Sequence, residues 1–434
     1  AELTGLRSRA GLNGAACRVL ARQGPQGVHP QKYNVRVPRT GQSMVVSSDN
    51  LNARGAPLPR VRVRCGTGSS ELASHLQVDI NKYMRKVDLA SMGNGSVDGL
   101  CMVFKALAAS PTFAKEFFGR RPFVLECGEA VSQLWTQEDQ IALCEPPKGQ
   151  DSSSLLKTSP QCRFTHEGIG DQTVHSFCAV AEKDVTLTPA TVCRRLKSST
   201  WVFSGLESLA QPVAELCGAL MEALGLPFAS CNCYMSGLDL HVTAPLHTDR
   251  MDSFVVQTEG CKRWRVFDSS DELPPWPVLD ANVPDRGKNG EVLLVQQAGP
   301  ILLDEMLRSG DVLYLPRGLP HATSTFDTAG PNGKEQQTRV STSLTVSILL
   351  ETVGLTFDKL LRCVGGMLDG GDHPGTRSHM AEEVLMATPR HRELRQVLPL
   401  GFLSRGLLGD GAGEGEVTAE AWAAAVAAEA RRLA

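Results

Sequence analysis

Two patterns that would classify the chain at once are missing from it. Its 434 residues contain 13 cysteines, an odd number spread from Cys17 to Cys363, without any CxxC pair. Secreted domains place their cysteines as an even disulfide framework, so this distribution favours a reducing intracellular compartment. No apolar run is long enough to cross a membrane, so we expect no membrane partner. The nucleus or nucleolus and the cytoplasm are the expected compartments, and an organelle is the alternative.

The motif with the most chemical content is His247-Thr248-Asp249. In a strand, residues two apart project from the same face, so this step aims an imidazole and a carboxylate at one point. The run GDVLYLPRGLPH, residues 310–321, ends in His321 after a turn, a short apolar strand and a second turn. Two histidines and one carboxylate that leave open positions on a metal are typical of non-haem Fe(II) oxygenases. We therefore predict that His247, Asp249 and His321 are metal ligands and the catalytic centre. The alternative is that each histidine is an ordinary hydrogen-bonded residue of a β-rich core.

A lysine between the two halves of this motif is the candidate for binding an anionic cosubstrate. Residues 253–267, SFVVQTEGCKRWRVF, are two apolar runs around a Glu-Gly turn, so we expect a hairpin. Counting in twos from Lys262 puts Trp264 and Val266 on its face, which we assign to the interior. A buried cation is costly unless it meets an anion, and the distal carboxylate of 2-oxoglutarate is a natural partner. The alternative is that Lys262 reaches solvent at the mouth of a barrel.

With these segments in view, the chain resembles the JmjC-type ribosomal oxygenases, cupin-like 2-oxoglutarate dioxygenases that hydroxylate ribosomal proteins. The matching pieces are Asn232-Cys233-Tyr234, His247-Thr248-Asp249, the run EGCKRWRV at 259–266 and the run at 310–321, with a weaker echo at 113–122. The resemblance covers roughly residues 100–350. It implies a double-stranded β-helix core of the jelly-roll or cupin type and Fe(II) as the metal. It also implies that Asn232, Tyr234, Lys262 and Ser341 line the 2-oxoglutarate pocket.

The sequence departs from the family pattern just before the first metal ligand. The family usually has proline directly before that histidine, whereas here Leu246 stands between Pro245 and His247. One extra residue also lies between Tyr234 and His247, which predicts a bulge in the strand. His241 lies in the same stretch but lacks the carboxylate two residues on. We therefore interpret His241 as structural or as part of the substrate approach.

The first 64 residues are the most basic part of the chain. They hold ten arginines and one lysine against one glutamate and one aspartate, a net charge of +9, whereas the whole chain carries −3. Alternating segments at 18–20, 32–37 and 43–46, separated by turns, predict a small SH3-like barrel over residues 1–54. A basic barrel suits contact with RNA or the ribosome. The alternatives are a solvated basic surface without a partner and an Arg-rich organelle-targeting region.

Composition divides the remainder into three parts. Residues 55–85, rich in Arg, Gly and Ser, predict a linker. Residues 86–350 form the expected oxygenase domain, which is mainly β with helices. Within it, an apolar stripe of Leu209, Val213, Leu216, Leu220 and Leu224 predicts a helix that ends at Gly225. A long insertion at 271–300 is expected to frame the substrate mouth. Residues 351–434 predict helices at 352–367, 379–397 and 418–433, which the resemblance associates with a dimerisation domain. A homodimer is therefore expected, and a simple helical cap is the alternative.

The sequence thus predicts an Fe(II)- and 2-oxoglutarate-dependent dioxygenase that hydroxylates a protein side chain, on a ribosomal protein. Within the enzyme class, the alternative is demethylation of N-methyl-lysine in histones, which uses the same oxidant. From another class, the alternative is a non-catalytic JmjC-like binding module. A damaged metal motif or a missing cosubstrate cation would favour the binding module, and neither is seen in the sequence.

Overall fold

The computed structural model describes short strands in the first 60 residues and most of the chain from 61 to 348. Its gaps lie at 67–68, 86–97, 133, 146–155, 160, 167–177, 180–184, 227, 274–285, 289–290 and 327–338, and residues 349–434 lie outside the described part. The predicted helices of the C-terminal region therefore fall outside the described residues.

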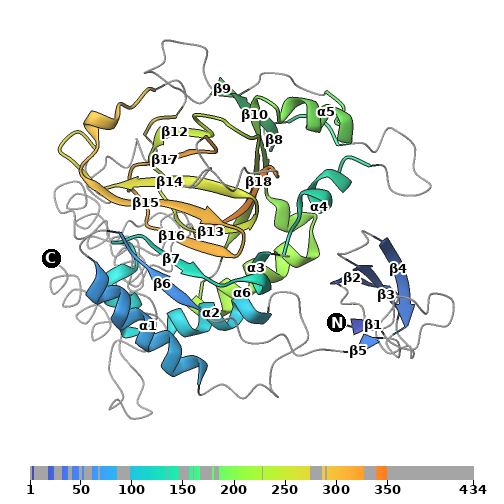
Figure 1. Ribbon diagram of the computed structural model, residues 1–434, viewed down its shortest axis with the longest axis horizontal. Helices are drawn as coiled ribbons and strands as arrows, with labels where there is room; N and C mark the ends of the chain where they lie inside the picture. Colours follow the sequence, from blue (N-terminus) through green and yellow to red (C-terminus); the bar gives the residue numbers. More distant parts are fainter. Residues whose placement is uncertain are drawn as a thin grey trace, which may run out of the picture.

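Two facing antiparallel sheets form the centre of the molecule (Figure 1). The larger sheet runs in the order β6-β7-β16-β13-β18-β11-β10-β8-β9, and the smaller in the order β12-β17-β14-β15. The strands are β6 (Arg62–Arg64), β7 (Phe123–Glu126), β8 (Cys162–His166), β9 (Cys178–Ala179), β10 (Ser199–Ser204), β11 (Ser230–Ser236), β12 (Ala244–His247), β13 (Asp252–Glu259), β14 (Cys261–Phe267), β15 (Ile301–Arg308), β16 (Asp311–Leu315), β17 (His321–Ser324) and β18 (Ser341–Ile348). This is the predicted double-stranded β-helix, in which the chain passes repeatedly from one sheet to the other between β11 and β18.

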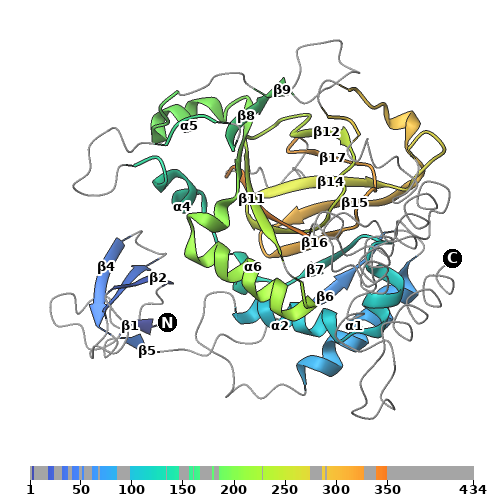
Figure 2. The same cartoon turned by 180° about the vertical axis from the view of Figure 1, so that it is seen from behind.

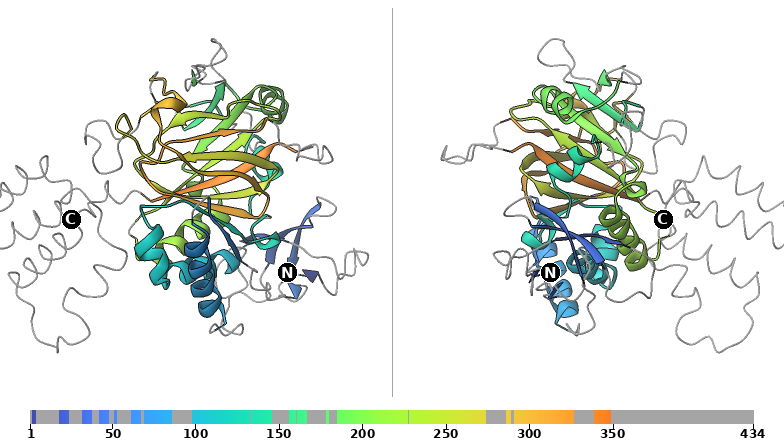
Figure 3. Two further views of the ribbon diagram at one scale, coloured as in Figure 1. Left: turned by 60° about the vertical axis from the view of Figure 1, so that its left-hand side comes forward. Right: turned by 90° about the vertical axis from the view of Figure 1, so that its right-hand side faces the viewer.

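Helices cover the outer face of the larger sheet. They are α1 (Ser70–Met84), α2 (Asp98–Ala108) and α6 (Gln211–Leu224), which lie below the sheets in Figure 1 and again in the reverse view of Figure 2. Their apolar side chains share one buried cluster with Phe254, Val256 and Leu344 of the central strands. The side views of Figure 3 show the same layering. The predicted stripe is confirmed from Val213 onward, and Gly225 ends α6 in the left-handed conformation, φ 64°. Leu209 precedes the helix and is exposed.

The alternation of side chains along a strand also fills the space between the sheets. On β13, Phe254 and Val256 face the helices, so Val255 faces the smaller sheet. Val255 packs there with Trp264 and Val266 of β14 and with leucines of β15 and β16. The face predicted for Lys262 is therefore the interior.

One element of the sequence interpretation is wrong. The segment 253–267 turns at Gly260, with φ 63°, but β13 and β14 do not pair with each other. β13 pairs with β16 and β18, whereas β14 pairs with β15 and β17. The turn carries the chain from one sheet to the other. The alternation of apolar and polar residues cannot distinguish this turn from a hairpin, because both arrangements bury the same side chains of the two strands.

The N-terminal region contains the predicted strands. β2 (Arg18–Gln23), β3 (Lys32–Val37) and β4 (Gln42–Ser47) form an antiparallel sheet, and β1 (Glu2–Leu3) pairs with β5 (Leu51–Asn52). The expected linker at 55–85 is different, because it contains β6 and α1. β6 extends the larger sheet beside β7, and Leu76 and Ile80 of α1 are fully buried. The arginine and glycine content of this segment suggested a linker, but the segment forms a strand and a helix.

Among the described helices, none is long and apolar enough to span a membrane.

Candidate metal centre

His247 and His321 face each other across two paired strands. β12 and β17 are antiparallel, and His247 is the direct cross-strand partner of His321. Their ring centroids are 4.1 Å apart, and both side chains are buried. The pairing is irregular between Ala244 and His247, which confirms the predicted bulge. Two segments far apart in the sequence therefore present their imidazoles at one point.

Backbone carbonyls set the tautomer of both imidazoles. Nδ1 of His247 lies 2.8 Å from the carbonyl oxygen of Pro245, and Nδ1 of His321 lies 2.9 Å from that of Leu319. A carbonyl oxygen only accepts, so each Nδ1 carries the proton and each Nε2 keeps its lone pair. Burial lowers the pKa of both histidines, that of His247 to about 3, and the neighbouring His321 adds to that shift. Both rings are therefore neutral near pH 7, the form in which histidine binds a metal.

Asp249 supplies an oxygen to the same point. Its Oδ2 is 3.8 Å from Nε2 of His247 and 3.6 Å from Nε2 of His321, and the ligand atoms of the three residues lie within 4.8 Å of one another. Burial opposes ionisation of Asp249, but the Lys288 ammonium and the two imidazoles outweigh it and hold the pKa of the carboxyl below its usual range. Two nitrogens and one oxygen on one side of a point fit a metal such as Fe(II). The structure brings the predicted residues together, and their role as ligands stays a prediction.

Lys288 is a residue of this site that the sequence analysis did not single out. Its ammonium donates to Oδ1 of Asp249, the carboxylate oxygen other than the one closest to the histidines. Lys288 belongs to the insertion between β14 and β15, where no periodicity or motif marks it. The described stretch 286–288 lies against the metal motif, and the expectation that the insertion frames the substrate mouth stays a prediction.

A second unpredicted group holds the turn that carries His321. Asp252 is fully buried and accepts from the Tyr314 hydroxyl at 2.6 Å and from the Arg317 guanidinium. The backbone N–H of Gly119 donates to the Tyr314 oxygen at 2.7 Å, and that of Gly318 donates to the carbonyl of Asp249 at 2.7 Å. The turn that leads to His321 is thereby bonded both to the buried carboxylate and to the backbone of the metal motif.

Lys262 projects into the interior between the sheets. Its side chain is 3% exposed, and among the described residues no carboxylate lies within ion-pair distance of it. Burial lowers the pKa of Lys262 to about 8. Its ammonium lies 5.9 Å from the centroid of the Tyr234 ring. A buried cation beside a phenol, without a carboxylate of its own, fits the binding of an anionic group.

The other residues predicted for the cosubstrate pocket come from β11 and β18. Their neighbours Cys233 and Leu344 belong to the helix-side core, so Asn232, Tyr234 and Ser341 point into the interior. Burial raises the pKa of the Tyr234 phenol, and the Asp249 carboxylate adds to the rise. Tyr234 therefore lies within the field of the metal motif and also beside Lys262.

Ser341 forms hydrogen bonds within the protein in addition to its predicted role in the cosubstrate pocket. Its buried hydroxyl accepts from Nε2 of Gln257 at 2.9 Å, and the same amide donates to the carbonyls of Glu259 and Thr342. Ser341 is thus joined to the network at the turn between β13 and β14. The binding of 2-oxoglutarate by Asn232, Tyr234, Lys262 and Ser341 stays a prediction.

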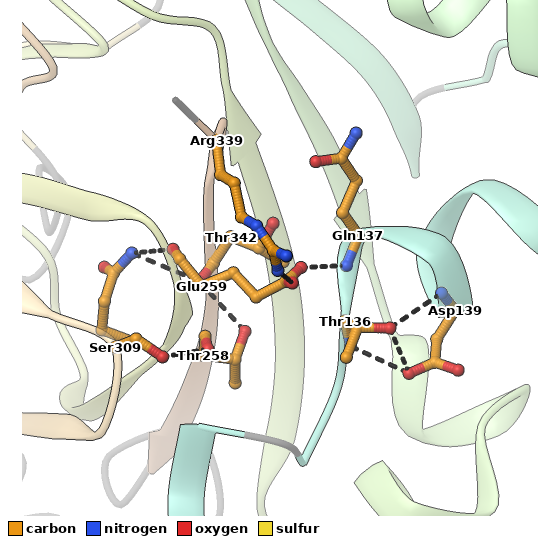
Figure 4. A network of polar contacts seen from close by, with 9 residues as sticks. Thr136, Gln137, Asp139, Thr258, Glu259, Ser309, Arg339 and Thr342 are labelled. Atoms are coloured by element: carbon orange, nitrogen blue, oxygen red, sulfur yellow. Dashed lines mark hydrogen bonds and ion pairs between the residues drawn. The ribbon is translucent and has the colours of Figure 1, made fainter. Parts of the chain in front are cut away.

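Glu259 ties this turn to the rest of the domain (Figure 4). Its carboxylate accepts from the backbone N–H of Gln137 and from Arg339 at 3.1 Å. Gln137 begins α4 (Gln137–Ala142), whose N-terminus is capped by Thr136 with Asp139 in a reciprocal pair of hydrogen bonds. Burial raises the pKa of Glu259. Glu259 therefore anchors the turn before Lys262 to α4 and to Arg339.

The comparison with known families fits this geometry. The family model described as "JmjC domain" matches residues 210–332, which include α6 and strands β11 to β17. Residues 210–332 are therefore similar to the JmjC domain. The resemblance to JmjC-type ribosomal oxygenases is thereby confirmed for this part of the chain. A JmjC domain with a His-Asp-His group uses Fe(II) and 2-oxoglutarate, the cofactors expected from the sequence.

Several relatives match about a quarter of the chain. The protein called bifunctional lysine-specific demethylase and histidyl-hydroxylase NO66 of Drosophila grimshawi is 36% identical over 110 residues, 25% of this chain and 14% of the relative. The protein of the same name from Brugia malayi is 32% identical over 117 residues, 26% of this chain and 15% of the relative. The chain therefore spans less than a fifth of the length of these relatives.

Among solved structures, the Escherichia coli ribosomal oxygenase YcfD is similar to this chain at 15% identity, with a TM-score of 0.35, over 65% of this chain and 66% of that chain. A structure of YcfD in complex with cobalt and 2-oxoglutarate is similar at 17% identity and a TM-score of 0.35, over 64% of each chain. A likeness at this level carries no argument about the site, which rests on the geometry above.

Proposed function

We propose that the chain is an Fe(II)- and 2-oxoglutarate-dependent dioxygenase that hydroxylates a side chain of a ribosomal protein. One observation carries the proposal. The ligand atoms of His247, Asp249 and His321 converge within 4.8 Å of one another, in the same barrel into whose interior the buried Lys262 projects. A binding module would need neither a set of ligands that leaves metal positions open nor a cation without a carboxylate partner among the described residues.

Each group has a distinct task in this proposal. The two Nε2 atoms and Oδ2 of Asp249 would hold the metal on one side and leave its other side to cosubstrate. Lys262 would bind the distal carboxylate of 2-oxoglutarate, and Tyr234 would line the space between Lys262 and the metal. When bound, Fe(II) with 2-oxoglutarate and O2 supplies oxidation of an unactivated C–H bond, with release of succinate and CO2. The chain needs no acid–base pair for this reaction, only fixed positions for the metal, the cosubstrate and the target side chain.

The buried thiols are consistent with an oxidative centre that uses no cysteine. Burial raises the pKa of Cys127 and Cys233 far above the usual value and that of Cys162 to about 11. Thiols in this environment stay protonated and unreactive near pH 7. The proposal accordingly assigns no catalytic role to these cysteines.

The substrate class is proposed from two sources. The sequence resembles ribosomal oxygenases, and the relatives bear the name histidyl-hydroxylase. The basic segment at residues 1–64, with its net charge of +9, supports a partner rich in phosphate, such as ribosomal RNA beside the target protein. The nucleus or the cytoplasm would supply such a target, and a homodimer through residues 351–434 remains part of the proposal.

Demethylation of N-methyl-lysine in histones is the second candidate, because the names of the relatives pair it with hydroxylation. The two reactions use the same oxidation and differ only in the carbon atom that the target presents to the metal. An experiment can therefore separate them without any change to the enzyme.

The test is to incubate the Fe(II)-loaded protein with 2-oxoglutarate and either a ribosomal protein fraction or methylated histones. Mass spectrometry of the digested proteins then measures the products. The proposal predicts a gain of one oxygen atom on a ribosomal peptide, absent with His247→Ala. Loss of a methyl group from histones, without any oxygen gain in the ribosomal fraction, would establish the alternative instead.

A further inference from the structure

Lys288 makes a contact to the metal motif that the proposed reaction does not by itself require. Its ammonium donates to Oδ1 of Asp249, while the Nε2 atoms of both histidines lie closer to Oδ2. The two oxygens of one carboxylate therefore have different neighbours. One faces the histidines, and the other is occupied by a cation from the insertion.

The segment that carries Lys288 is fixed to the metal motif by its backbone. The N–H of Thr248 donates to the carbonyl of Arg286 at 3.0 Å, and the N–H of Arg286 donates to the hydroxyl of Thr248 at 3.0 Å. This reciprocal pair joins the residue between the two ligands to the residue two before Lys288. These two hydrogen bonds therefore fix the backbone near Lys288 and place its ammonium beside Asp249.

Close packing and the partly exposed carboxylate of Glu291 hold the same segment from the other side. Gly287 has φ +75°, and a Cβ at this position would lie 2.4 Å from the carbonyl oxygen of Leu246. Glu291 accepts from the backbone N–H of Gly287 at 2.7 Å and from Nε of Arg286 at 2.7 Å. Only glycine permits this approach, and Glu291 closes the loop around it. The segment is built to lie against the metal motif.

We propose that Lys288 is a positioning residue that occupies the outer oxygen of Asp249 and so leaves a single carboxylate oxygen to the metal. A carboxylate that is free to turn can bind a metal through both oxygens. Three protein ligand atoms leave more positions for cosubstrate than four. Lys288 therefore keeps open a position that the second oxygen would otherwise take.

The charge of Lys288 acts in the same direction as its hydrogen bond. An ammonium next to a ligand repels a divalent cation and attracts the 2-oxoglutarate dianion. Its removal should strengthen metal binding and weaken cosubstrate binding. Loss of a residue that merely supports the loop would instead disorder the motif and weaken both. The opposite signs of the two changes separate positioning from support.

The experiment compares wild type with Lys288→Met, using Co(II) and 2-oxoglutarate as the ligands in titration calorimetry. For Lys288→Met, we expect Co(II) to bind about tenfold more tightly and 2-oxoglutarate to bind the Co(II)-loaded protein about tenfold more weakly, because the loss of one ammonium changes the two electrostatic interactions in opposite directions. Lys288→Arg keeps the charge and the donor, and should restore both affinities to near the wild-type values.

A matched control is Lys105→Met, which removes a lysine from an ion pair with Glu222 on the helical layer, at 2.8 Å. It should leave both affinities unchanged. If Lys288→Met weakens both ligands together, or changes neither, the proposal is wrong. Circular dichroism checks the fold, and Lys288→Gln, which removes the charge but keeps a donor, takes the place of Lys288→Met if that variant does not fold.

This inference rests on the proposed metal centre and cosubstrate, but not on the target. Its measurements are binding constants, so absence of turnover on any protein leaves them valid. If the wild type binds neither Co(II) nor 2-oxoglutarate, both the proposed function and the inference fail. If it binds both and Lys288→Met does not separate them, only the inference fails.

Discussion

His247 and His321 are direct partners in the pairing of β12 with β17, and their rings lie 4.1 Å apart. This relationship explains why the metal motif can be split between distant parts of the sequence. An antiparallel pair fixes the two Cα positions, and a carbonyl two residues before each histidine fixes the ring. The preorganised pair needs only Asp249 to complete three ligands.

His247→Ala should abolish tight metal binding, because the remaining histidine and carboxylate cannot hold an ion from one side. We expect the Kd for Co(II) to rise about 100-fold or more, as measured by titration calorimetry. His241→Ala is the matched control, since His241 is exposed and stacks on Phe326, with the ring centroids 3.7 Å apart. Equal losses in the two variants would contradict the assignment.

Lys262→Met should weaken 2-oxoglutarate binding and leave Co(II) binding intact. A charge-assisted hydrogen bond contributes roughly 1.5–3 kcal/mol, so the affinity should fall on the order of 10- to 100-fold. Arg263→Met provides the comparison, because Arg263 follows directly but points outward to Asp304 at 2.7 Å. If 2-oxoglutarate binds Lys262→Met as it binds wild type, Lys262 is structural.

Cosubstrate binding should depend on pH through Lys262. Burial lowers the pKa of this ammonium to about 8, and only the protonated form attracts a carboxylate. Affinity for 2-oxoglutarate should therefore be full below pH 8 and decline about tenfold per pH unit above it. Lys262→Arg stays protonated, so its affinity should be flat over the same interval. A wild-type profile that matches that of Lys262→Arg would show that another group binds the cosubstrate.

Arg317→Met should destabilise the protein strongly, because it leaves the fully buried Asp252 carboxylate without its cation. Removing one partner of a buried pair costs roughly 3–5 kcal/mol. The free energy of unfolding, measured by urea denaturation, should fall by that amount. Lys105→Met breaks a more exposed ion pair and should cost roughly 0–1 kcal/mol. A similar small loss in both variants would show that Asp252 does not depend on Arg317.

The parts of the site that the sequence could predict are those fixed by local periodicity. The HxD spacing predicted that His247 and Asp249 converge, although β12 ends at His247 and Asp249 follows it. The alternation around Lys262 identified the interior side of β14 correctly. The extra residue before His247 predicted the bulge. Each of these inferences needs only the geometry of a single strand.

The parts that could not be predicted depend on which strands become neighbours. The Gly260 turn connects two sheets and not two strands of a hairpin, because sheet exchange leaves the residue pattern unchanged. Lys288 reaches Asp249 through backbone pairing within an insertion that has no periodicity. Asp252 is buried only because Tyr314 and Arg317, distant in sequence, supply its donors. All three features depend on tertiary contacts between residues that are distant in the sequence.

The most direct test of the central claim is the formation of succinate from 2-oxoglutarate by the Fe(II)-loaded protein, with wild type beside His247→Ala. We predict succinate formation by wild type that rises when a ribosomal protein fraction is added, and none above background with His247→Ala. Equal succinate formation by both proteins, or none by a wild type that binds Fe(II) and 2-oxoglutarate, would contradict the account.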